Sequence, residues 1–202
     1  MSELAGTIPL EHITGDAAWH TPSRGRVGMV SLIVAETAVF TIFVVAYVFY
    51  MGRDQYGPTP KQVLDLPIFN TVCLLSSSLT IWLAERSIER RNLGGFSLWW
   101  GATFLLGLIF LLGTAREWYK LIVHDQLTVR TNLFGTTFYS LVGLHATHVI
   151  VGLLMIGVVL ALSLTKHVRP EHSERIQTLA LYWHFVDAVW VVVFTVVYVI
   201  GR

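Results

Sequence analysis

The chain has 202 residues, of which 54% are hydrophobic and only 13% are charged, about half the charged share of an ordinary soluble domain. A soluble fold of this size could not bury so much apolar surface, so the composition excludes an ordinary soluble enzyme and a disordered chain. The 14 basic and 13 acidic residues nearly balance, which argues against nucleic acid as a partner, and the single cysteine, Cys73, excludes an intrachain disulfide.

Five stretches of the chain are almost free of charged residues and predict an all-α bundle of five transmembrane helices. Each stretch approaches or exceeds the roughly 20 residues that a helix needs to cross a bilayer. None shows the alternation of apolar and polar residues that is typical of a strand in a membrane barrel. Glu36 and Asp187 are the charged residues within them. The stretches cover residues 27–51, 66–84, 92–115, 131–165 and 176–201. We expect helices over residues 27–51, 66–86, 95–119, 131–165 and 176–200.

The longest stretch, residues 131–165, contains no polar break and is too short for two spans and a turn. It therefore predicts one long, tilted helix. We expect a polar tail over residues 1–25 and one membrane domain over residues 26–202. An odd number of spans places the two termini on opposite sides. Lys and Arg are slightly more frequent in segments on the side of the N-terminus, which favours a cytoplasmic N-terminus and a periplasmic C-terminus.

Glu36 is the clearest candidate for a functional side chain, because it lies well inside the first predicted span with apolar neighbours on both sides. An acidic side chain at the centre of a membrane helix costs roughly 2.5–3.5 kcal/mol on insertion scales. It could handle protons or contact a partner, or it could be a structural acid bonded to another helix. We expect a neutral carboxyl that is hydrogen-bonded to a neighbouring helix or to a partner subunit.

Three further groups of polar residues lie in the later spans. His145 and His148 are three residues apart, as are His184 and Asp187, so each pair shares one side of its helix. With Glu36 they could form a metal site, but interhelical hydrogen bonding is the favoured interpretation. Asn70 at the start of the second span predicts a cap or an interhelical bond. We expect no metal in this chain.

The end of the third predicted span carries a group of charged and aromatic residues, Arg116, Glu117 and Trp118. Such a group could contact lipid headgroups or a partner, or it could be a solvated helix end. The chain contains no nucleophile with its base and no phosphate-binding loop, so we predict no catalytic residue.

Two motifs resemble the signature of subunit III of haem-copper terminal oxidases. One runs from Tyr182 to Trp190 as YWHFVDAVW, and the other runs from Gly143 to Gly152 as GLHATHVIVG. Weaker matches at residues 35–36, 67–71 and 116–119 follow in the order of the family, so the resemblance covers residues 27–202. The five helices are similar to the short form of bacterial cytochrome c and quinol oxidases. At Arg116 the chain departs from the family, which usually has a small or neutral residue there.

This resemblance implies an accessory subunit of the bacterial inner membrane that binds no redox centre of its own. The haems and copper would lie in partner subunits, with the chain packed beside catalytic subunit I in a complex that also holds subunit II. The family is thought to sustain proton uptake, to protect the active site during turnover and to bind phospholipids. Glu36 matches the intramembrane glutamate of the family.

Several alternatives stay open from the sequence. The complex could use cytochrome c or quinol as its electron donor, or it could be associated with nitric oxide reductase. A membrane metalloenzyme and a proton-coupled transporter are more distant possibilities. The lack of an inverted repeat and of paired broken helices argues against the transporter.

Overall fold

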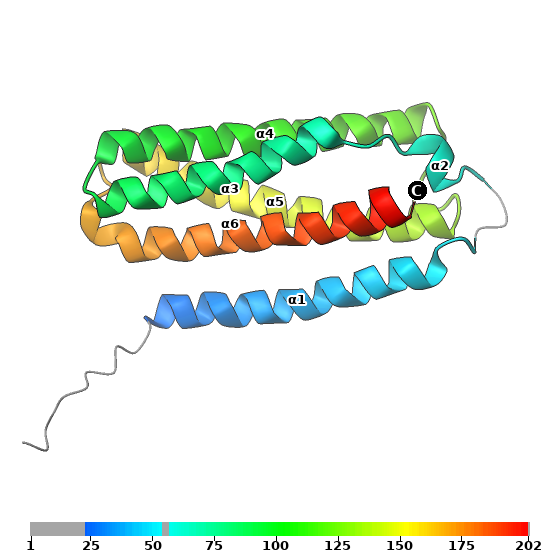
Figure 1. Ribbon diagram of the computed structural model, residues 1–202, viewed down its shortest axis with the longest axis horizontal. Helices are drawn as coiled ribbons and strands as arrows, with labels where there is room; N and C mark the ends of the chain where they lie inside the picture. Colours follow the sequence, from blue (N-terminus) through cyan, green and yellow to red (C-terminus); the bar gives the residue numbers. More distant parts are fainter. Residues whose placement is uncertain (1–22, 54–56, 202) are drawn as a thin grey trace, which may run out of the picture.

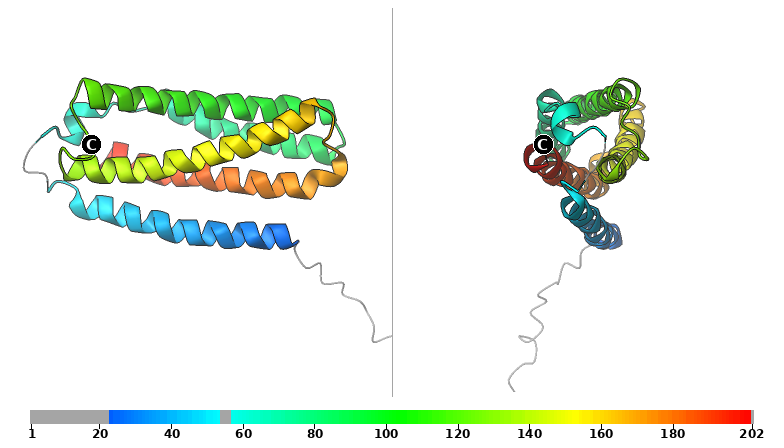
Figure 2. Two further views of the ribbon diagram at one scale, coloured as in Figure 1. Left: turned by 180° about the vertical axis from the view of Figure 1, so that it is seen from behind. Right: turned by 90° about the vertical axis from the view of Figure 1, so that its right-hand side faces the viewer.

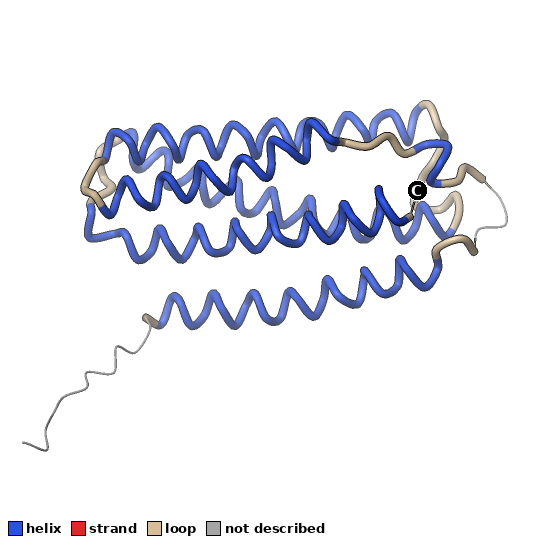
Figure 3. Tube along the Cα trace, in the orientation of Figure 1, coloured by secondary structure: helices blue, strands red, loops and turns tan. Residues whose placement is uncertain are grey.

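The computed structural model describes residues 23–53 and 57–201, and within them it contains five helices long and apolar enough to cross a membrane. They are α1 (Arg24–Tyr50), α3 (Ile68–Glu89), α4 (Leu93–Val123), α5 (Leu133–Leu164) and α6 (Ser173–Phe194). A π-helical segment, η3 (Thr195–Ile200), continues α6, and a short turn, η2 (Pro170–His172), precedes it. The described residues form helices joined by short loops, without strands (Figure 3). The predicted all-α fold with five spans is confirmed for this part of the chain.

The helices begin where the sequence supplies caps for their free N–H groups. The side chain of Ser23 accepts a hydrogen bond from the backbone N–H of Arg26 at the start of α1. Asn92 does the same for Gly95 in α4, and Asn132 for Gly135 in α5. These side chains satisfy donors that a helix start leaves without a partner. Prolines precede or begin the remaining spans at Pro67 and Pro170.

Four of the helices form a ring, and α1 lies outside it. Seen along the bundle, α3, α4, α5 and α6 are arranged around a common centre, whereas α1 lies beside α6 (Figure 2). Buried side chains of these four helices form the core between them. The contacts of α1 are with α5 and α6. Phe40 and Tyr47 are its buried residues, so most of its surface is left for lipid or a partner. The turn from α3 to α4 and the turn from α5 to α6 lie at the end of the bundle where α1 begins (Figure 1).

Three tryptophans tie the ring together through their indole N–H groups. Trp100 of α4 donates to the carbonyl of Ile156 in α5 at 2.9 Å. Trp183 and Trp190 of α6 donate to hydroxyl groups of α3, at 2.8 and 3.2 Å. All three side chains are almost fully buried. A buried indole needs a partner for its N–H group, so these bonds restrict how the helices can rotate against one another.

The fold differs from the sequence prediction at the first connection and at the end of α4. A short helix, α2 (Pro60–Val63), forms in the first connection, where the side chain of Gln62 accepts a hydrogen bond from the backbone N–H of Thr59. The helix α4 continues to Val123, four residues beyond the predicted end at residue 119. Its last turn carries Lys120, which forms an ion pair with Asp65 at 2.6 Å and so supports the extra turn against the segment before α3. Most of the predicted polar tail, residues 1–22, lies outside the described residues.

Candidate functional site

Glu36 contacts a histidine of a neighbouring helix. Its carboxyl oxygen Oε2 lies 3.2 Å from Nε2 of His148 in α5, and the two side chains are 27% and 12% exposed. The other ring nitrogen of His148, Nδ1, is 2.8 Å from the carbonyl of Leu144. A carbonyl can only accept, so this bond places a hydrogen on Nδ1. The expected polar partner of Glu36 is therefore His148.

The bond to Leu144 leaves two possible arrangements for this pair. Either a protonated Glu36 donates to a neutral His148, or a carboxylate accepts from an imidazolium. Both arrangements have the same total charge of zero, which lowers the cost of placing the pair in a membrane. The pair lines a cavity of about 260 Å³ that Tyr182 also borders. A pair that can pass a proton from one member to the other is suited to proton transfer. The same hydrogen bond also holds α1 against α5.

A second polar cluster joins α3 to α6. The hydroxyl of Ser78 donates to Oδ2 of Asp187, and Nδ1 of His184 lies 3.2 Å from the same hydroxyl oxygen. Because the hydroxyl hydrogen is used on Asp187, the ring N–H of His184 donates to Ser78. The contacts of His184 and Asp187 with Ser78 are interhelical hydrogen bonds, the interpretation that the sequence favoured for these residues.

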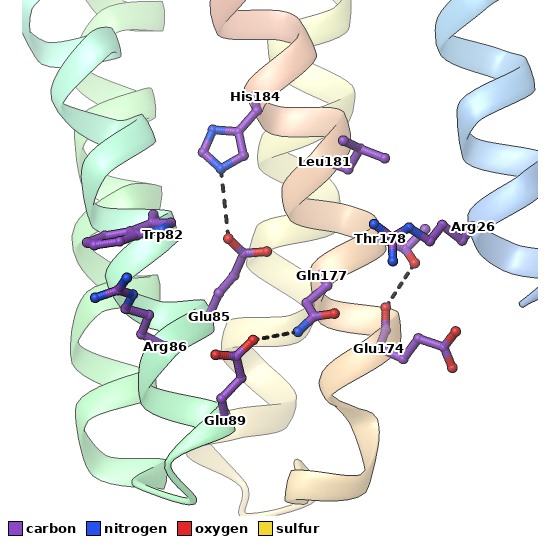
Figure 4. Close-up of a pocket in the computed structure, with 10 residues that line it drawn as sticks. All are labelled: Arg26, Trp82, Glu85, Arg86, Glu89, Glu174, Gln177, Thr178, Leu181 and His184. Atoms are coloured by element: carbon purple, nitrogen blue, oxygen red, sulfur yellow. Dashed lines mark hydrogen bonds and ion pairs between the residues drawn. The ribbon is translucent and has the colours of Figure 1, made fainter. Parts of the chain in front are cut away.

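This second cluster borders a polar pocket at the end of the bundle. The pocket has a volume of about 280 Å³ and lies between α3 and α6, close to the start of α1. Glu85 points towards His184, with 3.9 Å between its Oε2 and Nε2 of the ring (Figure 4). Further out, Gln177 donates to Glu89 at 2.9 Å. The groups from Glu85 to Asp187 thus form a continuous polar line from the pocket to a carboxyl that is 2% exposed.

His145 does not share the surroundings of His148, although the two lie three residues apart. Its ring stacks on Trp190 with 5.0 Å between the centroids and meets the edge of Phe110 at 5.9 Å. The side chain is 1% exposed, and neither ring nitrogen has a hydrogen-bond partner among the described residues. His145 is therefore a packed ring of the core in this structure, and the expected network does not include it.

The residues at the end of α4 divide between the core and the surface. Glu117 is half-buried and accepts a hydrogen bond from the hydroxyl of Tyr198 at 3.0 Å. Trp118 is also half-buried and packs edge-on against Tyr139, at 5.3 Å between ring centroids. Arg116 is exposed. The side chain of Asn70 rests on Gly113, so Asn70 makes an interhelical contact.

The polar residues lie in separate places. Among the described residues, no group of three or more His, Cys, Asp and Glu side chains is arranged to hold a metal ion. Glu36 and His148 lie between α1 and α5, whereas His184 and Asp187 lie between α3 and α6. The alternative of one site that unites the histidines and acids is thus not supported in this part of the chain.

Reasoning from the sequence missed three partners in these clusters: Ser78, Glu85 and Tyr198. Glu85 lies one residue beyond the charge-free stretch 66–84, so the pattern of charges does not mark it as a residue within a span. Ser78 and Glu85 are seven residues apart and so lie on one side of α3, a spacing that could have singled them out. No comparable signal links Tyr198 to Glu117, because the two belong to different helices.

Comparison with known proteins identifies the chain's relatives. The family described as cytochrome c oxidase subunit III matches residues 11–202. The cytochrome c oxidase subunit 3 of Synechocystis sp. is 35% identical over 207 residues, which cover 98% of this chain and 85% of the relative. The corresponding subunit of Alkalihalophilus pseudofirmus is 38% identical and covers 82% of each chain. The cytochrome bo(3) ubiquinol oxidase subunit 3 of Pseudomonas aeruginosa is 34% identical over 84% of this chain and 81% of its own.

Proposed function

The chain belongs to the cytochrome c oxidase subunit III family, and from this membership we propose that it serves as the accessory subunit III of a haem-copper oxidase in a bacterial inner membrane. The observation that carries the proposal is the family match over residues 11–202, which contain all five apolar helices. The subunit packs beside catalytic subunit I, in a complex that also contains subunit II. The haems and copper that carry electrons belong to those partners.

Within such a complex the chain sustains proton uptake and protects the active site during turnover. Glu36 is the residue we assign to this role, either as a proton-exchanging group or as a partner contact. Its bond to His148 supports the assignment, because this pair can move a proton between its members without changing its total charge. The cluster of Ser78, His184 and Asp187 has a structural role: it holds α3 against α6.

Purification through this chain in a mild detergent tests the proposed function. We expect the two partner subunits to co-purify and the preparation to show the visible spectrum of haem. After separation in a harsher detergent, the spectrum should remain with the partners. Recovery of the chain without any haem protein, from membranes that contain an active oxidase, would contradict the proposal. A loss of proton uptake on Glu36→Gln in an otherwise complete complex would support the proton role, and unchanged uptake would leave only the contact role.

A relative named for ubiquinol supports a second candidate for the electron donor. The subunit from Pseudomonas aeruginosa shows that this family also serves a quinol oxidase. The purified complex should therefore be assayed with reduced cytochrome c and with a quinol in parallel. The donor that supports oxygen consumption identifies the class of complex.

We also propose that the N-terminus is cytoplasmic and the C-terminus periplasmic. Arg90 and Glu171 lie at the end of the bundle where α1 begins, and Arg130 lies in the loop from α4 to α5 at the other end. After the buried Cys73 is replaced by alanine, cysteines at positions 90 and 171 should react with a membrane-impermeant reagent only from the cytoplasm. A cysteine at position 130 should react only from the periplasm, and the reverse result would contradict the orientation.

A further inference from the structure

The hydroxyl group of Tyr198 is bonded to a half-buried carboxyl group. Tyr198 belongs to η3 and is 1% exposed, and its hydroxyl donates to Oε1 of Glu117 in α4 at 3.0 Å. Two other buried tyrosines, Tyr139 and Tyr182, donate to backbone carbonyl groups instead. A carboxylate can take up the proton of a group that is bonded to it, whereas a peptide carbonyl is far too weak a base. Of these three phenols, Tyr198 is therefore the one with a proton acceptor in place.

The bond between Tyr198 and Glu117 favours the loss of an electron from the phenol. A phenol that loses one electron becomes a strong acid and gives its hydroxyl proton to a base in contact with it. Here that proton passes to the carboxylate, and the products are a neutral phenoxyl radical and a neutral carboxylic acid. The pair thus loses its negative charge. Because a charge is costly in a half-buried site of a membrane protein, the surroundings assist this oxidation.

A tryptophan lies against the ring of Tyr198. The ring centroids of Trp190 and Tyr198 are 6.2 Å apart, and the Trp190 side chain is 1% exposed. The indole N–H of Trp190 donates to the hydroxyl of Thr71, which is too weak a base to take the indole proton. An electron lost from Trp190 therefore leaves a buried positive charge, which is costly. That charge disappears when Trp190 takes an electron from Tyr198 and the phenolic proton moves to Glu117.

Glu117 connects this buried pair of rings to the outside of the bundle. It lines an open groove between the start of α3 and the last turns of α4. The groove lies at the end of the bundle that also carries α2 and the end of the chain (Figure 1). Protons and small one-electron reductants can approach Glu117 there without any unfolding of the core.

We propose that Trp190, Tyr198 and Glu117 form a one-electron trap for strong oxidants. An oxygen-derived radical or a high-valent haem iron takes one electron from Trp190 and is reduced by it. Trp190 recovers the electron from Tyr198, whose O–H bond breaks while its proton forms an O–H bond on Glu117. A one-electron reductant such as ascorbate then reduces the phenoxyl radical, and Glu117 returns the proton. Each cycle removes one oxidising equivalent at the expense of one electron from the reductant and leaves the protein unchanged.

Flash photolysis of the purified chain tests the trap. A laser excites a ruthenium tris-bipyridine complex, and a cobalt(III) ammine complex removes one electron from it, which leaves a strong one-electron oxidant in solution. Radicals are followed by transient absorption and by electron paramagnetic resonance. We expect a tryptophan radical that decays as a tyrosyl radical forms, and a faster loss of the tyrosyl signal when ascorbate is added. A tyrosyl signal that appears without a preceding tryptophan radical would overturn the role of Trp190.

The variant Tyr198→Phe and its matched control locate the radical. Tyr198→Phe keeps the ring in the core and removes the hydroxyl, so the tyrosyl signal that follows the tryptophan radical should be lost. Tyr139→Phe removes a buried phenol that is bonded to a carbonyl, and this signal should remain. Circular dichroism checks that both variants retain their helices. Equal signals in the wild type and Tyr198→Phe, or an equal loss in the two variants, would overturn the proposal.

The variant Glu117→Gln tests the proton acceptor. The amide oxygen can still accept the hydrogen bond of Tyr198, so the fold should be retained, but an amide cannot take up the proton. The tyrosyl radical should therefore form about a hundredfold more slowly, at the lower end of what a positioned base contributes to a proton transfer. An unchanged rate of formation would show that Glu117 is not the acceptor.

The role of the trap in a complex rests on the proposed function, because the oxidase would supply the oxidant. During prolonged turnover with added peroxide, Tyr198→Phe should lose activity faster than Tyr139→Phe, although both begin with the same turnover and haem content. Equal rates of inactivation would overturn this protective role. If no haem protein accompanies the chain at all, the accessory function is wrong, whereas flash photolysis of the chain still decides whether the trap exists.

Discussion

The indole ring of Trp183 is held between two glycines, and adding one methyl group to either should destabilise the bundle. In the structure a Cβ atom on Gly152 of α5 would lie 2.8 Å from Cε3 of this indole. A Cβ atom on Gly107 of α4 would lie 2.8 Å from Cη2, near the opposite edge of the ring. The side chain of Trp183 is 0% exposed, and its N–H donates to Ser77 of α3. The ring therefore contacts three other helices at once.

The cost of Gly152→Ala follows from these contacts. Carbon atoms normally approach to about 3.5–4.0 Å, so the methyl group requires the ring or a helix to shift by roughly 0.7 Å or more. A shift towards Gly107 is opposed by α4, and a rotation lengthens the 2.8 Å bond to Ser77. Overpacking of this kind costs about 1–3 kcal/mol, whereas alanine favours a helix over glycine by up to about 1 kcal/mol. We expect Gly152→Ala to lower the free energy of unfolding by about 1–2 kcal/mol, which is roughly a five- to thirtyfold change in the folding equilibrium.

Unfolding of the purified chain by increasing sodium dodecyl sulfate in mixed micelles measures this change. Gly101→Ala is the matched control, because a Cβ atom there would meet only Leu160 at 3.7 Å, an ordinary contact. Both variants gain the same preference of alanine over glycine for a helix. The difference between their free energies of unfolding therefore isolates the contact with Trp183. The double variant Gly107→Ala with Gly152→Ala should lose more than the sum of the single losses, because each methyl group blocks the shift that relieves the other.

The reasoning is refuted if Gly152→Ala is as stable as Gly101→Ala. That result would mean that Trp183 can move aside without cost and that it does not set the spacing of α4 and α5. Strict additivity in the double variant would contradict the picture of a ring confined from two sides, even if each single variant is destabilised.

Three further predictions concern the polar clusters and the redox chemistry. The Glu36→Gln variant should assemble normally, because its amide can donate a hydrogen bond to a neutral His148. The Glu36→Ala variant should weaken the packing of α1 and lower the yield of purified complex. Equal yields of the two variants would contradict this prediction. Asp187→Ala should lower the amount of assembled complex more than the turnover per remaining haem, because it leaves the hydroxyl of Ser78 without its acceptor; a specific catalytic defect at normal yield would argue for a direct role. The chain separated from its partners should show no Soret band and bind no stoichiometric copper, as optical spectra and metal analysis can establish.

Two histidines show the limit of reasoning from a single helix. His145 and His148 are three residues apart, so their side chains leave α5 at angles about 60° apart, and interhelical hydrogen bonds were expected for both. That difference is enough to separate them: His145 packs against Trp190 inside the ring, whereas His148 reaches Glu36 of α1. The direction of a side chain follows from its helix, but its partner depends on which helix lies in that direction.

The same limit explains Glu117, which could be read as part of a solvated helix end. Its position near the end of a span was evident, but the half-buried carboxyl bonded to Tyr198 was not. The two residues lie 81 positions apart and belong to different helical segments, so their contact depends on how the bundle is arranged. Arg116, the neighbour of Glu117 in sequence, is exposed.

The sequence by itself determined the all-α fold, the five spans and the family of this protein. It could do so because long apolar stretches in a membrane must satisfy their backbone hydrogen bonds internally, which leaves a helix as the outcome whatever its neighbours are. Only the tertiary structure decided that Glu36 meets His148, that Ser78 joins His184 to Asp187, and that two glycines make room for Trp183. These contacts depend on how each helix is rotated and which helix lies beside it. Packing in a membrane relies on close fit rather than on an overall hydrophobic drive, so that information resides in the three-dimensional arrangement and not in the pattern along any one helix.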